Sequence, residues 1–155
     1  MQKSTKILIS FLICTGLIFT YSLYKGKQEA KERKEDYLAY QEAVKCINEV
    51  RDINEAMTTI YKTTEKYKET KGTLINKARG HSILDEYSQV EIIIENLFEV
   101  DPNLESDNEL NLIYAKSAYE KRNITNSKEA INRINKSELN KEQKIKLDEL
   151  IKQIG

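Results

Sequence analysis

Apolar residues are spread along this chain in two different patterns. Residues 7–24 form a run of eighteen residues with no charged side chain. From Tyr37 to Tyr67, and again over residues 82–155, apolar residues instead recur at steps of three and four. Steps of three and four follow the period of an α-helix and place the apolar residues on one of its faces. The pattern therefore predicts one continuous apolar segment followed by amphipathic helices.

The run at residues 7–24 predicts a transmembrane helix. Eighteen helical residues reach roughly 27 Å, which is close to the hydrocarbon thickness of a bilayer. Lys3 and Lys6 precede the run, and Tyr21 and Tyr24 lie near its end, where aromatic rings favour the level of the lipid headgroups. No Ala-x-Ala-like cleavage site follows the run, so we expect an uncleaved signal-anchor.

The orientation of this anchor has two interpretations. Basic residues are more numerous in the charged juxtamembrane segment, 25–36, than in the short basic tail, 1–6. By the positive-inside rule this difference places the following domain in the cytoplasm. A short basic tail before an apolar run is also the layout of an uncut export signal. We favour the second interpretation, a single-pass protein of the cell membrane with an extracytoplasmic domain.

Residues 37–155 predict one α-helical domain. Tryptophan is absent, proline occurs once and glycine five times, and this scarcity of helix breakers favours helices nearly throughout. The stretch from Tyr37 to Tyr67 predicts one long amphipathic helix. Gly72 and Gly80 are expected to stop helices, with only a short helical turn between them.

Capping signals divide the second half of the domain into short antiparallel helices. Ser82, followed by Asp85, is expected to begin a helix that ends at Asp101, because the residue before a proline is disfavoured in the helical conformation. Three further helices are expected to begin at capping pairs: Ser106 with Glu109, Asn126 with Glu129, and Asn140 with Gln143. The predicted fold class is all-α, with a transmembrane helix, a long amphipathic helix and short antiparallel helices in a bundle or α-solenoid.

Residues 82–155 resemble a tetratricopeptide repeat protein. The run from Ile94 to Pro102 resembles the second helix of such a repeat closing on its usual proline. Large and small positions of a following repeat are matched by Tyr114, Ala118, Ala130 and Ile134. The sequence departs from the pattern at Lys121, where an aromatic residue is common. The resemblance implies an α-solenoid surface that binds other proteins, and an unrelated helical bundle is the alternative.

Charge is balanced over the whole chain but unevenly distributed. Residues 81–120 carry ten acidic side chains against one lysine, whereas residues 121–155 carry nine basic side chains against five acidic ones. The two stretches can attract each other, or the acidic stretch can bind a basic partner. The candidate partner-binding residues are the acidic Glu91, Glu95, Glu99 and Asp101 and the tyrosines Tyr114 and Tyr119.

Few residues are available for catalysis or metal binding. His81 is the only histidine and has no second nitrogen or sulfur ligand at a telling spacing, and Cys46 has no histidine nearby. The acidic residues around Asp107 resemble a calcium loop, but Ser106 and Leu112 stand where a glycine and an acid are required. Phosphate-binding glycine loops and basic stripes typical of nucleic-acid binding are absent. We therefore predict no enzyme activity, no catalytic residues, no cofactor, no metal and no nucleic-acid partner.

The predicted function is a membrane-anchored interaction or scaffold domain that tethers another protein at the membrane surface. The alternative is a self-associating spacer or envelope component, a homo-oligomer formed through the 37–67 helix. Its identity as a bacterial protein is suggested by the abundance of Lys, Asn and Ile, which is typical of an AT-rich genome.

Overall fold

Helices make up all of the secondary structure in the part of the chain that is described. The computed structural model describes residues 3–155, with side chains from residue 14 onward. Within that range lie α1 (Lys3–Asn48), α2 (Ile53–Tyr67), α3 (Lys71–Ile83), α4 (Tyr87–Val100), the 3₁₀ helix η1 (Pro102–Ser106), α5 (Asn108–Glu120), α6 (Ile124–Arg133) and α7 (Lys141–Ile154). The all-α prediction is thereby confirmed for these residues. Residues up to Ala39 form one compact unit and Tyr40–Gly155 form a second.

The first unit consists of the N-terminal part of α1. Its charged stretch carries ion pairs between side chains four residues apart, Lys25 with Glu29 at 4.0 Å and Lys31 with Glu35 at 3.8 Å. Among residues 14–155, none of the helices has an apolar run of the length needed to cross a bilayer. The predicted transmembrane segment, 7–24, falls partly outside that range, since the side chains of residues 7–13 are not described.

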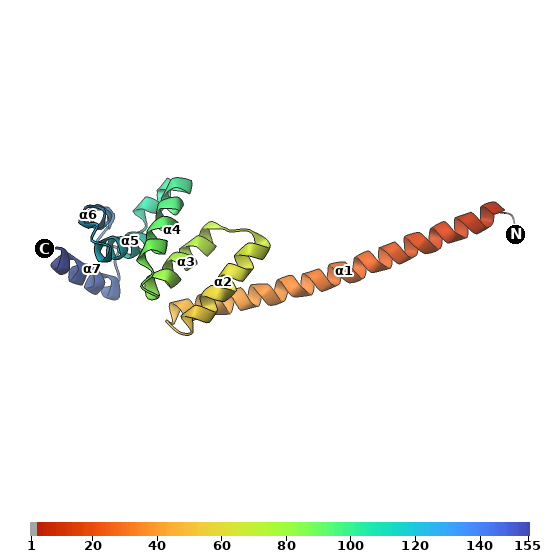
Figure 1. Ribbon diagram of the computed structural model, residues 1–155, viewed down its shortest axis with the longest axis horizontal. Helices are drawn as coiled ribbons and strands as arrows, with labels where there is room; N and C mark the ends of the chain where they lie inside the picture. Colours follow the sequence, from red (N-terminus) through yellow and green to blue (C-terminus); the bar gives the residue numbers. More distant parts are fainter. Residues whose placement is uncertain (1–2) are drawn as a thin grey trace. The chain divides into compact units, whose positions relative to one another are not determined.

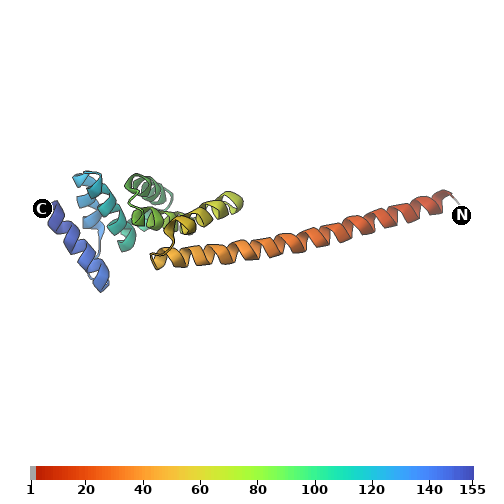
Figure 2. The same ribbon diagram turned by 60° about the horizontal axis from the view of Figure 1, so that its bottom comes forward.

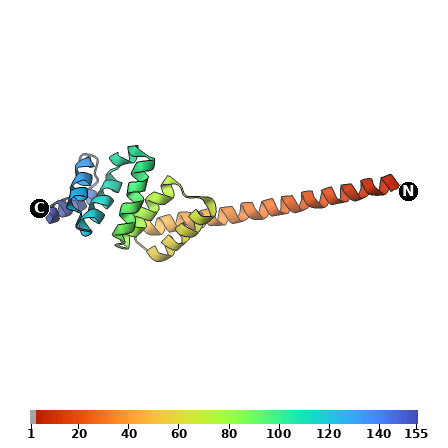
Figure 3. The ribbon, with the colours of Figure 1, turned by 45° about the horizontal axis from the view of Figure 1, so that its top comes forward.

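Three helical hairpins and a final helix form the second unit. The end of α1 is joined to α2 by a short turn, α3 is paired with α4, and α5 is paired with α6. The helices from α2 to α5 follow one another in space in the order of the sequence, and α6 and α7 both pack against α5 (Figures 1 and 2). Figure 3 shows α3 and α4 side by side between α2 and α5. Each hairpin therefore packs mainly against its neighbours in the chain.

The three hairpin turns share one backbone motif. Val50, Asp85 and Arg122 have φ values of 52°, 56° and 63°, in the left-handed region that is unusual for residues other than glycine. In each turn the next residue donates its backbone N–H to a carbonyl of the preceding helix, and the N···O distances are 2.9, 2.9 and 2.8 Å. This Schellman-type arrangement satisfies carbonyls left open at the helix end and reverses the chain.

Small, buried residues occupy equivalent positions in the three hairpins. Ala43, Ala78 and Ala115 lie seven residues before the left-handed residue of their hairpin, with exposures of 5, 0 and 0%. The fourth residue of each second helix is likewise small or β-branched and buried: Ala56, Val90 and Ser127. Side chains of this size let the paired helices approach closely, so the hairpins repeat in packing as well as in their turns.

The stretch from residue 37 to 67 is not one helix, and this prediction was wrong. α1 ends at Asn48, α2 begins at Ile53, and the left-handed Val50 and Asp52 turn the chain between them. The apolar spacing continues across the turn because both helices bury the same stripe, which forms a cluster of Ala43, Ile47, Ile53, Ala56, Met57 and Ile60. Part of the face that suggested self-association is therefore buried inside the chain, whereas Tyr37, Val50 and Tyr67 are 58, 66 and 38% exposed.

Gly72 and Gly80 do not stop helices, which is a second correction. Both lie within α3, whose thirteen residues occupy a stretch where only a short turn was expected. A Cβ atom at Gly80 would lie 2.1 Å from the Sδ atom of Met57, so glycine allows α2 and α3 to approach closely there. Tertiary packing outweighs the low helix propensity of glycine at this position.

The predicted helix boundaries were correct in some places and wrong in others. α4 ends at Val100 before Asp101, and Asn140 with Gln143 forms a capping box at α7, as predicted. Ser82 instead lies in the last turns of α3, while α4 begins at Tyr87. The caps of α5 and α6 are Asp107 and Asn123 rather than Ser106 and Asn126. The errors at α5 and α6 each selected one polar residue in a run that holds several possible caps.

Candidate functional site

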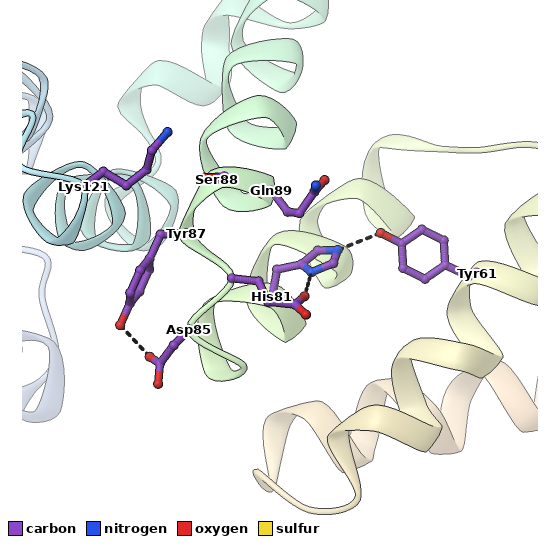
Figure 4. Close-up of a pocket in the computed structure, with 8 residues that line it drawn as sticks. Tyr61, His81, Asp85, Tyr87, Ser88, Gln89 and Lys121 are labelled. Atoms are coloured by element: carbon purple, nitrogen blue, oxygen red, sulfur yellow. Dashed lines mark hydrogen bonds and ion pairs between the residues drawn. The ribbon is translucent and has the colours of Figure 1, made fainter.

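A pocket of about 680 Å³ lies beside the turn between α3 and α4 (Figure 4). We call it the α3–α4 turn pocket, and its lining residues are Tyr61, His81, Asp85, Glu86, Tyr87, Ser88, Gln89 and Lys121. Tyr61 comes from α2, Lys121 follows α5, and the other residues belong to the end of α3, the turn and the start of α4. The Schellman-type turn at Asp85 therefore determines where most of this lining lies.

His81 is held by hydrogen bonds on both of its ring nitrogens. It is 6% exposed, and its Nδ1 contacts the carboxylate of Glu86. An ionised carboxylate only accepts hydrogen bonds, so Nδ1 carries a proton and donates it to Glu86. In the neutral ring Nε2 is then the acceptor for the hydroxyl of Tyr61, at 2.6 Å. These two bonds connect α2 to the α3–α4 turn.

Tyr61 also contacts a buried lysine. The Nζ atom of Lys77, a residue that is 7% exposed, lies 4.3 Å from the centre of the Tyr61 ring and 2.5 Å from the Glu69 carboxylate. Burial, and then the negative charges of Glu86 and Glu69, raise the pKa of Tyr61 above its ordinary value. The phenol therefore stays protonated at neutral pH and keeps its bond to His81.

The other side of the pocket holds a second tyrosine and a carboxylate. The Tyr87 hydroxyl donates to Asp85 Oδ1 at 2.5 Å, and this bond is the main cause that raises the pKa of Tyr87 to about 12. Lys116 Nζ lies 3.8 Å from the same oxygen and 5.6 Å from the centre of the Tyr87 ring. A flexible, exposed cation is thus held loosely by one carboxylate and one aromatic face.

The chemistry of the pocket follows from which groups are already engaged. His81 and Tyr61 use their polar atoms on each other and on Glu86. Within the part of the chain whose side chains are described, no group of three or more His, Cys, Asp or Glu residues is arranged to hold a metal ion. The groups left facing solvent are the carboxylates of Asp85 and Glu86, whose side chains are 69 and 51% exposed. Binding of a cationic group is the chemistry that these carboxylates and rings suit.

Two of the predicted partner-binding carboxylates, Glu91 and Glu95, are engaged inside the chain. Glu91 is 8% exposed and forms an ion pair with Lys121 through Oε2, and its buried Oε1 has no hydrogen-bond partner. Glu95 accepts a hydrogen bond from the Tyr114 hydroxyl at 2.7 Å. The pairing of Glu91 with Lys121 is the kind of attraction expected between the acidic and basic stretches.

The remaining acidic candidates differ in their surroundings. Asp101 accepts a hydrogen bond from Lys71 Nζ at 2.6 Å, and this bond is the main cause that lowers the pKa of Asp101. It also caps η1 by accepting from the backbone N–H of Asn103. Glu99 is exposed on α4. Of the four predicted acids, Glu99 alone has no ion-pair or hydrogen-bond partner among the described residues.

The two predicted tyrosines belong to the core. Tyr114 is 7% exposed, with its ring edge-on to Phe98 at a centroid distance of 6.3 Å. Tyr119 is partly buried and packs against the same cluster. The ring of Tyr114 is therefore not available to a partner. Of the six candidates, Glu95 and Tyr114 are joined by a hydrogen bond, whereas Asp101 is bonded to Lys71.

Two other sequence features have structural surroundings of their own. Cys46 is partly buried, and its Sγ atom lies 3.6 Å from Nη2 of Arg51. Asp107, at the centre of the calcium-loop resemblance, caps α5 by accepting from the backbone N–H of Leu110 at 2.9 Å. The acidic spacing around Asp107 is therefore explained by helix capping.

Stability at alkaline pH is expected to depend on Tyr114. Burial, and then its bond to Glu95, raise the pKa of Tyr114 to about 12, above the value of about 10 for an unfolded tyrosine. A folded-state pKa above the unfolded value gives stability that is complete below about pH 10 and is lost as the pH rises toward 12. As the pH rises from 9.5 to about 11.5, the urea midpoint, followed by circular dichroism, should therefore fall less steeply in Tyr114→Phe than in the parent protein. The matched control is Tyr37→Phe, at a residue that is 58% exposed, and an equal slope in both variants would contradict the prediction.

Most residues of the pocket were not predicted from the sequence. His81 was identified as the only histidine, Asp85 was assigned to helix capping with Ser82, and Glu86 was not singled out. A signal was present in the close succession of the only histidine, two carboxylates and a tyrosine, His81 to Tyr87. Tyr61 lies twenty residues away from His81 in sequence, and no local pattern connects the two.

No protein-family model, curated protein or solved structure matches this chain.

Proposed function

We propose that this protein is a single-pass membrane protein whose helical domain binds another protein and tethers it at the membrane surface. Residues 7–24 are its anchor, and residues 40–155 are its interaction domain. The domain lies on the extracytoplasmic side, in keeping with the short basic tail before the anchor. The anchor confines the domain to the membrane plane and raises its effective concentration for partners there.

The observation that carries the proposal is the exposed apolar surface of α1. Leu17, Ile18 and Phe19 are 64, 65 and 65% exposed, and successive residues of a helix point to different sides. A helix that is apolar all round is stable when lipid or protein covers it. Burying apolar area gains about 25 cal/mol per Å², so such a surface favours insertion into a bilayer over contact with water.

The residues at the end of this apolar segment also favour a bilayer. Tyr21 and Tyr24 are 67 and 69% exposed, and Lys25 and Lys27 follow them directly. Aromatic and basic side chains favour the boundary between the hydrocarbon and the headgroups. The apolar run and its flanks therefore suit a bilayer rather than a soluble partner.

The repeated hairpins support a tetratricopeptide-like α-solenoid as the interaction domain. Small residues recur where the helices of each hairpin cross, at Ala43, Ala78 and Ala115. The corresponding position in α7, eight residues after its cap, is the exposed Asp148. A polar outer face of this kind is what a terminal helix of a stacked array needs. Such arrays present extended surfaces suited to protein binding.

The anchor is tested by placing charge within it. Leu17→Lys with Ile18→Lys should move the full-length chain from the floating membrane fraction to the soluble fraction in a density-gradient flotation of cell lysate. Each lysine near the centre of a span opposes insertion by about 2.5–3.5 kcal/mol. The matched control is Tyr37→Lys with Leu38→Lys, which places the same charges on exposed apolar positions of α1 outside the run. Flotation of both variants, or of neither, would contradict the proposal.

The tether is tested in cells with a photocrosslinking residue at position 92, where Ile92 is 60% exposed on α4. We expect a protein crosslinked to the parent chain to float with the membrane. In the variant with two lysines in the anchor, the same crosslinked protein should be soluble. A crosslinked protein that stays equally membrane-bound in both cases would show that this chain does not tether it.

A further inference from the structure

We propose that the α3–α4 turn pocket is the site where the domain binds its partner, and that it takes an arginine side chain from a basic segment of that partner. This inference rests on the proposed function, because it names the chemistry of the protein that is tethered. It also moves the binding site from the acidic row of α4 to the turn that precedes this helix.

The pocket holds two aromatic rings and two carboxylates. Figure 4 shows Tyr61 and Tyr87 on opposite sides of His81, with Asp85 below Tyr87. The Glu86 carboxylate lies against the His81 ring. A guanidinium group combines a planar face, which stacks on aromatic rings, with donors that match a carboxylate in two places. In this cavity the rings can stack on the planar face of a guanidinium group, and the carboxylates can accept hydrogen bonds from its N–H donors.

The two carboxylates are accessible and have oxygens to spare. The side chains of Asp85 and Glu86 are 69 and 51% exposed. Only one oxygen of Glu86 is used by His81, which holds the carboxylate in place without burying it. A carboxylate that is already oriented loses little conformational entropy when it binds a ligand.

The cation that lines the pocket is neutralised within the chain. Lys121 forms its ion pair with Glu91, a buried carboxylate that lies outside the lining. The lining therefore presents Asp85 and Glu86 with their charges largely unopposed on that side. Lys77, which approaches the Tyr61 ring, is likewise paired, with Glu69. The local charge favours a cationic ligand.

A resident lysine already occupies part of this arrangement. Lys116 Nζ lies 3.8 Å from Asp85 and 5.6 Å from the Tyr87 ring centre, and its side chain is 48% exposed. An ion pair between exposed side chains at this distance is weak, so a ligand can displace the lysine. Arginine binds a carboxylate more strongly than lysine does, because it donates two parallel N–H hydrogen bonds.

The acidic row of α4 is less suited to the same role. Glu91 and Asp101 are paired with Lys121 and Lys71, and Glu95 holds the Tyr114 hydroxyl. A partner that used these three acids would first break internal contacts of the folded domain, which leaves Glu99 as the one acid of the row that is exposed and unpaired among the described residues. The carboxylates at the turn require only the loosely held Lys116 to move aside.

The test measures binding of a fluorescein-labelled peptide in which three arginines alternate with glycines. The full-length protein is reconstituted in phosphatidylcholine nanodiscs, whose neutral lipid does not attract the peptide, and binding is followed by fluorescence anisotropy at low ionic strength. The parent should bind this peptide more tightly than one with lysine in place of arginine. A peptide with glutamate in place of arginine should not bind.

The pocket variant is Asp85→Asn with Glu86→Gln. Asparagine is at least as compatible as aspartate with the left-handed backbone at position 85, and glutamine keeps an acceptor for His81, so the fold should be retained. We expect affinity for the arginine peptide to fall about tenfold, because both carboxylates lose their charge while the rings of the pocket remain. The matched control is Asp148→Asn with Glu149→Gln, an exposed pair on α7, which should keep the parent affinity.

The outcomes separate this inference from the proposed function. Equal losses in the pocket and control variants would mean that net charge alone attracts the peptide, and would overturn the inference. So would a parent that floats with membranes but does not distinguish the arginine from the glutamate peptide. A chain that binds the arginine peptide through Asp85 and Glu86 but does not float would support the pocket and overturn the anchor.

Discussion

Replacing Ile94 with alanine is expected to lower the free energy of unfolding of the helical domain by about 2–5 kcal/mol. Ile94 is fully buried at the centre of α4, in the largest apolar cluster, which includes residues of α3, α5 and α6. The substitution removes three carbon atoms from a closely packed site and leaves a cavity that the neighbouring helices fill only in part. The loss should appear as a lower urea midpoint, followed by circular dichroism.

The matched control lies two residues earlier in the same helix. Ile92 is 60% exposed, so Ile92→Ala makes the same chemical change without opening a cavity. Its effect should stay within about 0.5 kcal/mol. Equal effects at positions 92 and 94 would mean that α4 does not bury the face described above.

The second large effect is expected at the ion pair between Glu91 and Lys121. The Glu91 side chain is 11% exposed, whereas that of Lys121 is 40% exposed. Lys121→Met should destabilise the domain by about 2 kcal/mol, because it leaves a buried carboxylate without its counter-charge. This value is below the usual cost of breaking a fully buried pair, since water reaches the lysine side.

Removing the carboxylate should have a different result. Glu91 Oε1 is buried without a hydrogen-bond partner, so Glu91→Leu eliminates an unsatisfied polar atom together with the charge. Adding Glu91→Leu to Lys121→Met should therefore restore stability to about the parent value in a urea titration. Destabilisation by the double variant that equals the sum of the two single variants would show that the residues are not coupled.

Signals that act over a few residues could be predicted from the sequence. Asn140 and Gln143 form the predicted capping box, and α4 ends before Asp101 because proline follows. The all-α class followed from a scarcity of helix breakers. These features depend on local backbone chemistry, which is written directly in neighbouring residues.

The hairpin turns could not be predicted in the same way. Val50, Asp85 and Arg122 adopt left-handed conformations without being glycine, so the usual mark of a helix end is missing at all three. Gly80 gave the opposite error, because its close approach to Met57 keeps it within a helix. Contact between α2 and α3 therefore outweighed local preference at Gly80.

The pocket required knowledge of which helices pack together. His81 and Glu86 are close in sequence, but Tyr61 and Lys121 come from other helices. The acidic residues of α4 formed a single row in the sequence, and the fold then divided them between internal pairs and the surface. Charge counted along a chain does not reveal which side chains are already neutralised by their neighbours.

The hairpin arrangement also bears on how the domain assembles. Each hairpin contacts its neighbours in the chain, so most contacts join residues that are near in sequence. Little loop entropy is lost before such contacts form, and low contact order is associated with rapid folding. The central α4 and α5 have neighbours on both sides, whereas α7 has a neighbour on one side only. Transient opening should therefore begin at α7, and amide hydrogens of α4 and α5 should exchange last.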